Sequence, residues 1–431
     1  MIPVSENFEK VTRLAEAGDT ASQARLGTML FQAGRIEEAV PWLEQASAGD
    51  QSSALNLLGV MHVNGLAVPL DFARAISLLS RAAHRGLKEA SYTLAGLYAN
   101  GFGVTADQES AWHYLMQACQ GGHMPALRVA GLLYALDESD STTGSILLRL
   151  AAGGGDGLAQ SALVSLLLLS GNPEDVAEAG YWASQAAAHG VYSVMHFIPS
   201  LTSSGMQPPM PAEPQWASLS RAVSKVLVTE NCRPVVSDII YEIDEVLPPF
   251  ICEYLINLSA PRLRPSLVMD PKTGQQMQNP VRTSHSMYFP PSMYDCAVGV
   301  VRSRMATLAG LPVEHAEPLA VLRYAPGQEY KPHQDYFVGT TATDSHTNIQ
   351  GGQRAVTVFA YLNDVESGGE TEFPELGVRI RAVRGRAVKF LNLNNDGHPN
   401  PKTLHAGCPV NRGEKWLATF WFRQRPFSWS S

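Results

Sequence analysis

Four residues in the last quarter of the chain have the types and spacing of an iron-dependent oxidation site. They are His333 and Asp335, two positions apart, then His405, and finally Lys415. Two imidazoles and one carboxylate are the ligands with which non-haem Fe(II) oxygenases hold their metal on one face, leaving the other face open for a co-substrate and O2. A cation shortly after the second histidine could hold the far carboxylate of an organic acid bound to that iron.

Strands are the elements that must position these residues. Side chains two apart on a strand point to the same side, so His333 and Asp335 can both face the interior of a barrel. His405 is expected on a later strand, and Lys415 at the start of the strand after that. One His-x-Asp pair is weak evidence in a chain with 12 histidines. The combination with the later histidine and lysine is much stronger.

Short β-type runs do recur through the C-terminal half, separated by clusters of Gly, Pro and Asn, as in a β-sandwich or barrel. Two helices are expected outside the sheets, at residues 245–258 and 292–308. The predicted strands are residues 239–243, 319–324, 355–362, 378–380, 387–391 and 416–422.

Three stretches around these residues resemble the prolyl 4-hydroxylase family of 2-oxoglutarate- and Fe(II)-dependent dioxygenases. They are residues 322–337, 353–374 and 403–416, and Arg282-Thr283-Ser284 resembles an earlier substrate-side motif of the family. The resemblance implies a double-stranded β-helix (jelly-roll) core with flanking helices. It also implies Fe(II), 2-oxoglutarate and O2 as cofactor and co-substrates, and it admits ascorbate.

The same resemblance assigns roles to individual residues. His333, Asp335 and His405 would bind iron, Lys415 would pair with the 5-carboxylate of 2-oxoglutarate, and Tyr324 would hydrogen-bond the same molecule. Arg282 and Tyr336 are the substrate-side candidates, although Arg282 could instead form a surface salt bridge and Tyr336 could be a core aromatic.

The N-terminal half is an internal repeat. Glycines at 27, 59, 96 and 131 recur in similar apolar segments, each followed by a second apolar stretch that ends in small residues. A period of this length indicates stacked helical pairs. The pattern resembles Sel1-like repeats, relatives of the tetratricopeptide repeat, and predicts an all-α solenoid. It is weakest in the fourth copy, where residues 137–144 break the register.

These patterns predict four segments: an N-terminal segment (1–19), the repeat array (20–195), a Pro-rich linker (196–233) and the dioxygenase domain (234–431). Residues 216–228 could form a helix, and residues 339–352 could form a substrate lid or a plain loop. Because every predicted catalytic residue follows the repeats, we expect deletion of residues 1–205 to leave the oxidation chemistry largely intact.

The predicted function is hydroxylation of a C–H bond, in a prolyl residue of a protein or peptide that the repeats help to bind. Three alternatives stay open: another residue, a small molecule, or an adaptor that only senses iron, oxygen or 2-oxoglutarate. The array could also be a spacer or a structural cap for the second domain.

The composition of the chain bears on its binding partners and on its location. The net charge of −8, from 40 acids and 32 bases, gives no general attraction to nucleic acid. No apolar stretch is long enough for a membrane span, and no signal peptide is expected. Five scattered cysteines without a CxxC motif favour a reducing compartment, and we expect a cytoplasmic protein.

Overall fold

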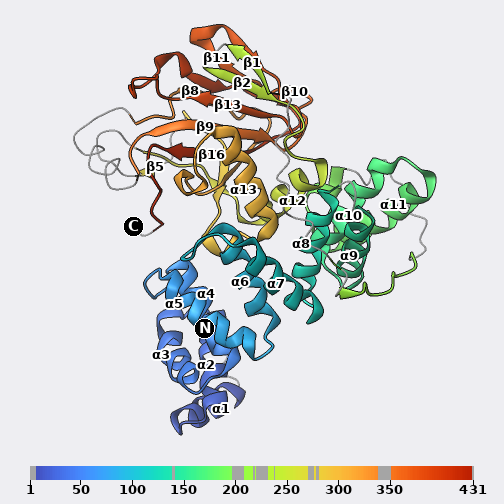
Figure 1. Cartoon of the computed structure of the whole chain (residues 1–431), viewed down its shortest axis with the longest axis vertical. Coiled ribbons are helices and arrows are strands. Elements are labelled where there is room, and N and C mark those ends of the chain that lie inside the picture. Colours follow the sequence, from blue (N-terminus) through green and yellow to red (C-terminus); the bar gives the residue numbers. More distant parts are fainter. Residues whose placement is uncertain are drawn as a thin grey trace.

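A computed structural model describes residues 6–137, 141–196, 208–216, 219, 232–236, 238–269, 276–277, 281–337 and 351–429. The N-terminal part is helical, and the C-terminal part is built from sheets with helices between them and the array (Figure 1). Most of the expected 216–228 helix and of the 339–352 loop falls outside the described residues. No described helix is both long and apolar enough to cross a membrane.

Helices of 11 to 16 residues make up the array, and successive helices pack side by side. They are α1 (Glu6–Glu16), α2 (Thr20–Gln32), α3 (Ile36–Ala48), α4 (Ser52–Asn64), α5 (Phe72–His84), α6 (Lys88–Asn100), α7 (Gln108–Gln120), α8 (Met124–Ala135), α9 (Ser141–Gly153), α10 (Gly157–Ser170) and α11 (Pro173–Ala188). The fourth copy keeps its helical pair, α8 and α9, although its sequence pattern is weak.

The recurring glycines allow close helix packing. A Cβ atom added at Gly27, Gly59 or Gly131 would lie 2.7–2.8 Å from a leucine side chain of the second helix of the same repeat. Gly96 of α6 is different, because its added Cβ would lie 2.5 Å from the backbone oxygen of Tyr294 in the C-terminal half. At this copy the repeat glycine therefore makes room for the oxygenase domain.

The C-terminal half contains two main antiparallel sheets. The larger has the order β1 (Cys232–Val236), β2 (Ile240–Ile243), β13 (Ala387–Leu391), β9 (Arg354–Tyr361), β16 (Lys415–Arg423), β7 (Ala320–Tyr324), β6 (His285–Tyr288) and β3 (Arg264–Pro265). The smaller has the order β12 (Val378–Ile380), β11 (Thr371–Phe373), β14 (His405–Gly407) and β8 (Tyr330–His333). Two short pairs complete the strands, β10 (Ser367–Gly368) with β15 (Val410–Arg412) and β4 (Val268–Met269) with β5 (Gln276–Met277).

The predicted double-stranded β-helix with an N-terminal helical array is the observed fold. All six predicted strands are present within one or two residues of the expected bounds, and the flanking helices are α12 (Pro249–Ser259) and α13 (Cys296–Ala309). Strand β16 lies at the centre of the larger sheet, between β9 and β7, and all nine of its residues are buried. Residues that alternate along this strand therefore face two different buried environments.

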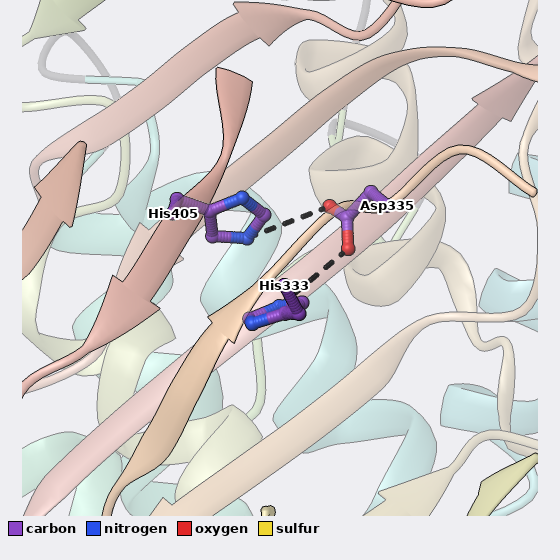
Figure 2. Close-up of side chains that lie close together, drawn as sticks. All are labelled: His333, Asp335 and His405. Carbon is purple, nitrogen blue, oxygen red and sulfur yellow. Dashed lines mark ion pairs between the residues drawn. The ribbon is translucent and has the colours of Figure 1, made fainter. Parts of the chain in front are cut away.

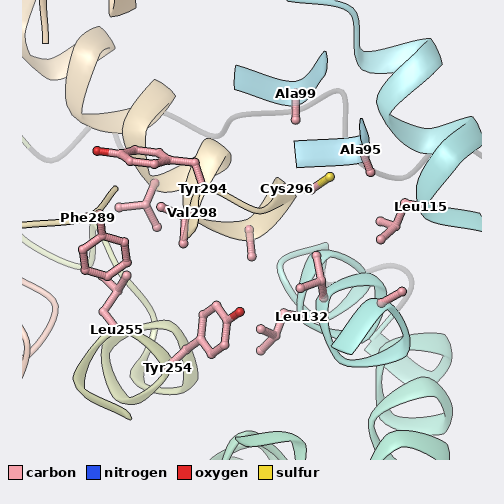
Figure 3. Close-up of a cluster of buried hydrophobic side chains, with 14 of the residues drawn as sticks. Ala95, Ala99, Leu115, Leu132, Tyr254, Leu255, Phe289, Tyr294, Cys296 and Val298 are labelled. Atoms are coloured by element: carbon pink, nitrogen blue, oxygen red, sulfur yellow. The ribbon is translucent and has the colours of Figure 1, made fainter. Parts of the chain in front are cut away.

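The array and the oxygenase domain share one hydrophobic core. Helix α13 packs against α6 and α8 of the array, and α12 packs against α10. Figure 3 shows Ala95 of α6 near Cys296 of α13, and Leu132 of α8 near Tyr254 of α12. The shared core argues against the expectation that the oxygenase domain works without the array, because removing the array would expose buried apolar surface of α12 and α13.

Candidate metal centre

All seven residues singled out in the sequence line one cavity of about 360 Å³ between the two sheets. They are Arg282, Tyr324, His333, Asp335, Tyr336, His405 and Lys415. Further walls come from residues that the sequence did not single out as site residues, and the most polar of these are Arg354, Thr357 and Thr371.

His333, Asp335 and His405 converge at one point of this cavity (Figure 2). The Nε2 atoms of both histidines lie 3.9 Å from a carboxylate oxygen of Asp335. The candidate ligand atoms of the three residues all lie within 4.8 Å of one another. Among the described residues, no other group of three His, Cys, Asp or Glu side chains is placed to hold a metal ion.

Strand pairing places the two histidines, but not the aspartate. His333 at the end of β8 is the register partner of His405 at the start of β14, so both rings project on the same side of the smaller sheet. Asp335 was expected on the same strand as His333, but β8 ends at His333. The chain bends after it, and the carboxylate is held from the larger sheet by Thr357, whose Oγ1 donates to Oδ2 at 2.7 Å.

Hydrogen bonds set the tautomer of both histidines. Nδ1 of His333 lies 2.9 Å from the backbone oxygen of Lys331, and Nδ1 of His405 lies 3.0 Å from that of Thr403. A carbonyl can only accept, so each Nδ1 must carry the proton. Each Nε2 then presents its lone pair toward Asp335, which is the arrangement that a metal ligand requires.

The charge states also suit a divalent metal. Burial, with a smaller effect of the neighbouring His405, lowers the pKa of His333 to about 3, so its imidazole is neutral at physiological pH. Burial pushes the pKa of Asp335 upward, but the neighbouring His405 and His333 and the Thr357 hydrogen bond outweigh it, and the net pKa is lowered. Metal binding requires this combination of neutral imidazoles and an ionised carboxylate.

Thr357 and Asn392 are functional residues that the sequence analysis missed. Asn392 is fully buried, and its Nδ2 donates to Oγ1 of Thr357 at 2.8 Å, which leaves the hydroxyl proton of Thr357 for Asp335. Outer hydrogen bonds of this kind orient a metal ligand and tune its basicity. The available signal was a threonine in the middle of an otherwise apolar predicted strand.

Lys415 is a buried cation without a carboxylate partner. Its side chain is 1% exposed, and none of the salt bridges between described residues involves it. Its Nζ lies 3.4 Å from Oγ1 of Thr371. The ring centroids of Tyr324 and Tyr361 lie farther away, at 5.5 and 5.6 Å from Nζ. Burial is the main reason that its pKa is lowered, to about 8. Burying an unpaired charge is unfavourable, so we expect this ammonium to pair with an anion that is not part of the chain.

The other three candidates lie around the same cavity. Tyr324 is buried on β7 as the register partner of Lys415. Arg282 is 7% exposed, stacks over the ring of Tyr330 at 5.0 Å, and has a buried Nη2 atom with no hydrogen-bond partner among the described residues. Tyr336 is half-buried, directly after Asp335. Arg282 is therefore not the surface salt bridge that the alternative interpretation predicted.

The donor set fits Fe(II), and the unpaired ammonium fits a dicarboxylate. Two imidazole nitrogens and one carboxylate on one side of a cavity leave room for further ligands on the other side. Lys415 lies in the same cavity and can pair with the remote carboxylate of 2-oxoglutarate. His333, Asp335 and His405 would hold the metal, and Lys415 and Tyr324 would hold the co-substrate.

Comparisons with known proteins agree with this site. The family model of the 2OG-Fe(II) oxygenase superfamily matches residues 319–423, which include the three candidate metal ligands and Lys415. The Sel1 repeat model matches residues 20–50, 52–87, 88–123 and 159–191, and it leaves out the weak fourth copy.

Similar proteins include plant and viral ones. Prolyl 4-hydroxylase 1 of Arabidopsis thaliana is 36% identical over 231 residues, which are 50% of this chain and 79% of that protein. Probable prolyl 4-hydroxylase 10 of the same plant is 38% identical over 191 residues, 40% of this chain and 64% of that protein. The crystal structure of a viral collagen prolyl hydroxylase from Paramecium Bursaria Chlorella virus-1 is 27% identical, covering 43% of this chain and 97% of the viral chain with a TM-score of 0.34.

The oxygenase match covers the residues of the His-Asp-His cluster, and the repeat match covers a different part of the chain. The chain belongs to the prolyl 4-hydroxylase family of 2-oxoglutarate- and Fe(II)-dependent oxygenases, with Sel1 repeats ahead of its oxygenase domain.

Proposed function

We propose that this chain hydroxylates prolyl residues of a protein or peptide, using Fe(II), 2-oxoglutarate and O2. The observation that carries the proposal is that the His333, Asp335 and His405 cluster and the unpaired Lys415 line one cavity. A dioxygenase of this class needs both features, one for the metal and one for the co-substrate.

Iron and 2-oxoglutarate, when bound, supply the oxidation: one oxygen atom of O2 enters the substrate C–H bond and the other enters succinate, with release of CO2. The residues of the chain bind and orient the reactants. Lys415 sets the position of the co-substrate through its remote carboxylate, and Thr357 holds Asp335 in place. Residues of both sheets line the site.

Aromatic side chains at the cavity support a prolyl substrate. Tyr288 is 50% exposed, and Tyr330, Tyr336 and Trp421 line the same cavity. Proline-rich segments are recognised by grooves of aromatic rings, because their extended backbone is preformed and their rings pack on aromatic faces. The unpaired Nη2 of Arg282 can donate to a backbone carbonyl of such a segment.

The Sel1 repeats support a protein substrate rather than a small molecule. Stacked helical repeats expose an extended surface that suits a polypeptide. In this proposal the array contributes affinity for residues of the substrate away from the hydroxylated proline. The proposal divides the chain into an N-terminal segment (1–19), the repeat array (20–195), a linker (196–233) and the dioxygenase domain (234–431).

We also propose a reducing compartment, the cytoplasm, and ascorbate as the accompanying reductant. Cys119, Cys252 and Cys296 are buried free thiols, and Cys408 is a free thiol of intermediate exposure. Thiols of this kind persist where the environment is reducing. We propose no nucleic-acid partner, because a net charge of −8 gives no general attraction to phosphate.

The test is turnover of a panel of synthetic peptides by the iron-loaded protein with 2-oxoglutarate. The panel pairs each proline-containing peptide with an alanine version, and mass spectrometry locates any added oxygen atom. His405→Ala should be inactive, whereas His398→Ala should match the wild type, because His398 is an exposed histidine paired with Asp396.

The same assay separates the alternatives. An added oxygen at residues other than proline would identify a different hydroxylase. Decarboxylation of 2-oxoglutarate without any modified peptide would favour a small-molecule substrate. Binding of iron and 2-oxoglutarate with no turnover at all would contradict an enzyme and favour a sensing adaptor.

A further inference from the structure

A second cavity, of about 260 Å³, lies where the array meets the oxygenase domain. Tyr192 and Ser193 line it on the array side. On the other side it is lined by Trp416 of β16 and by Glu414, in the turn before that strand. Glu414 and Trp416 flank Lys415 in sequence, so this cavity lies on the opposite side of β16 from the metal centre. Its full lining is Tyr192, Ser193, Glu253, Ile256, Leu362, Asn363, Asp364, Glu366, Arg384, Gly413, Glu414 and Trp416.

Glu253 of α12 is a buried carboxylate that is only partly satisfied. The residue is 4% exposed, and its Oε2 accepts a hydrogen bond from the hydroxyl of Ser165 in α10. Its Oε1 has no hydrogen-bond partner among the described residues. The nearest cation is Nη1 of Arg384, 3.5 Å from Oε1, on a side chain that is 35% exposed. Burial, more than any other effect, raises the pKa of Glu253 to about 7.

The walls of this cavity carry an excess of negative charge. Four acids line it, and Arg384 is the one base in the lining. Glu414 accepts from Arg323, Tyr192 and Trp416, and Glu366 pairs with Arg412, so these two acids are already engaged. Glu253 differs in that its Oε1 accepts no hydrogen bond from the described residues and has only the 3.5 Å ion pair with the partly exposed Arg384.

The side chains that line the cavity favour an organic cation over a metal ion. The acids do not converge as a metal site, since the described residues contain no second group of three metal-ligating side chains. Ile256, Leu362 and Trp416 give the cavity an apolar wall beside the carboxylate. An apolar wall next to a buried carboxylate is complementary to an alkyl chain that ends in a charged group.

We propose that this junction cavity binds a primary alkylammonium group, with the ammonium paired to Oε1 of Glu253 and the alkyl stem against Ile256, Leu362 and Trp416. The pairing satisfies a buried carboxylate oxygen that otherwise lacks a hydrogen bond. Two sources present this chemistry, a free small amine and the side chain of a lysine in a bound polypeptide.

Isothermal titration calorimetry with butylammonium tests the site, and 1-butanol is the neutral probe of similar size. The wild-type protein should bind butylammonium and show no measurable binding of 1-butanol. Glu253→Gln should weaken butylammonium binding by about tenfold or more, because it removes the charge and keeps an acceptor for Ser165. Glu375→Gln, a change at an exposed acid of the oxygenase domain, should leave binding unchanged.

Equal binding of the amine and the alcohol, or undiminished binding by folded Glu253→Gln, would overturn the proposal. Should Glu253→Gln fail to fold, a crystal structure of the wild type with butylammonium decides, since the ammonium must contact the Glu253 carboxylate. The blocked peptides Gly-Lys-Gly and Gly-norleucine-Gly identify the source. Binding of the lysine peptide alone points to a polypeptide side chain, binding of butylammonium alone points to a small amine, and binding of neither refutes the site.

Discussion

The side-chain amide of Asn100, at the end of array helix α6, donates to the backbone carbonyl of Tyr294 at 3.1 Å, just before oxygenase helix α13. In return, the guanidinium of Arg302 in α13 donates to the backbone oxygen of Asn100 at 3.0 Å. Asn100 and Arg302 are both buried. The array is thus joined to the oxygenase domain by buried polar contacts as well as by a shared apolar core.

Gly96→Ala should destabilise this junction. The new methyl group would lie 2.5 Å from the backbone oxygen of Tyr294, and backbone cannot move aside as a flexible side chain can. Overpacking of this kind costs about 1–3 kcal/mol, so the midpoint of thermal unfolding should fall. Thr93→Ala, a change at a half-buried position of the same helix, is the control. An unchanged midpoint for Gly96→Ala would show that the two parts separate easily.

Deletion of residues 1–205 should give a protein that aggregates or unfolds without cooperativity. The deletion exposes buried residues of α12 and α13, among them Tyr254 and Val298, and removes the Ser165 partner of Glu253. Circular dichroism and size-exclusion chromatography provide the measurement. A soluble, folded fragment that decarboxylates 2-oxoglutarate at the wild-type rate would contradict this prediction and restore the idea of separable domains.

Thr357→Val should weaken iron binding and leave the fold intact. Valine has nearly the same shape, but it cannot donate to Asp335 or accept from Asn392. Loss of such an outer hydrogen bond typically costs about 10–100-fold in metal affinity. Competition with a chromogenic chelator measures the affinity, and Thr307→Val in the exposed part of α13 is the matched control. Equal iron affinity in both variants would remove Thr357 from the site.

Lys415→Ala should raise the KM for 2-oxoglutarate by about a hundredfold or more. Removing one partner of a buried charge pair costs about 3–5 kcal/mol, because the other charge stays buried without compensation. Lys389→Ala, at a lysine of strand β13 that lies over the ring of Tyr241, is the control. Unchanged dependence on 2-oxoglutarate in Lys415→Ala would mean that another residue holds the carboxylate.

The pH dependence of 2-oxoglutarate use should follow the lowered pKa of Lys415. Burial brings this pKa to about 8, so the ammonium is charged below that pH and neutral above it. Both carboxylates of 2-oxoglutarate remain ionised across this range, so kcat/KM for 2-oxoglutarate should fall as the pH rises through about 8. In Lys415→Arg the guanidinium stays protonated, and this fall should disappear even where the affinity is lower. A fall that persists in Lys415→Arg would assign it to a different group.

Five strands of the larger sheet and the repeat helices could be predicted because their patterns are local. Residues 355–362 are almost continuously apolar, as a buried central strand requires, and the glycines of the repeats recur at nearly constant spacing. The smaller sheet was harder to predict. Strands β8, β11, β12 and β14 have only three or four residues, too few for most of them to show a periodic pattern.

Residue types and order alone determined the chemistry, since two histidines, one aspartate and one lysine have few other uses in this arrangement. Only the tertiary structure decided what holds them. Asp335 is set by Thr357 from the opposite sheet, and Lys415 is left unpaired because no acid of the described residues reaches it. The role of Gly96 and the junction cavity were likewise invisible in the sequence. Both depend on contacts between segments some hundred or more residues apart, and no local pattern records such contacts.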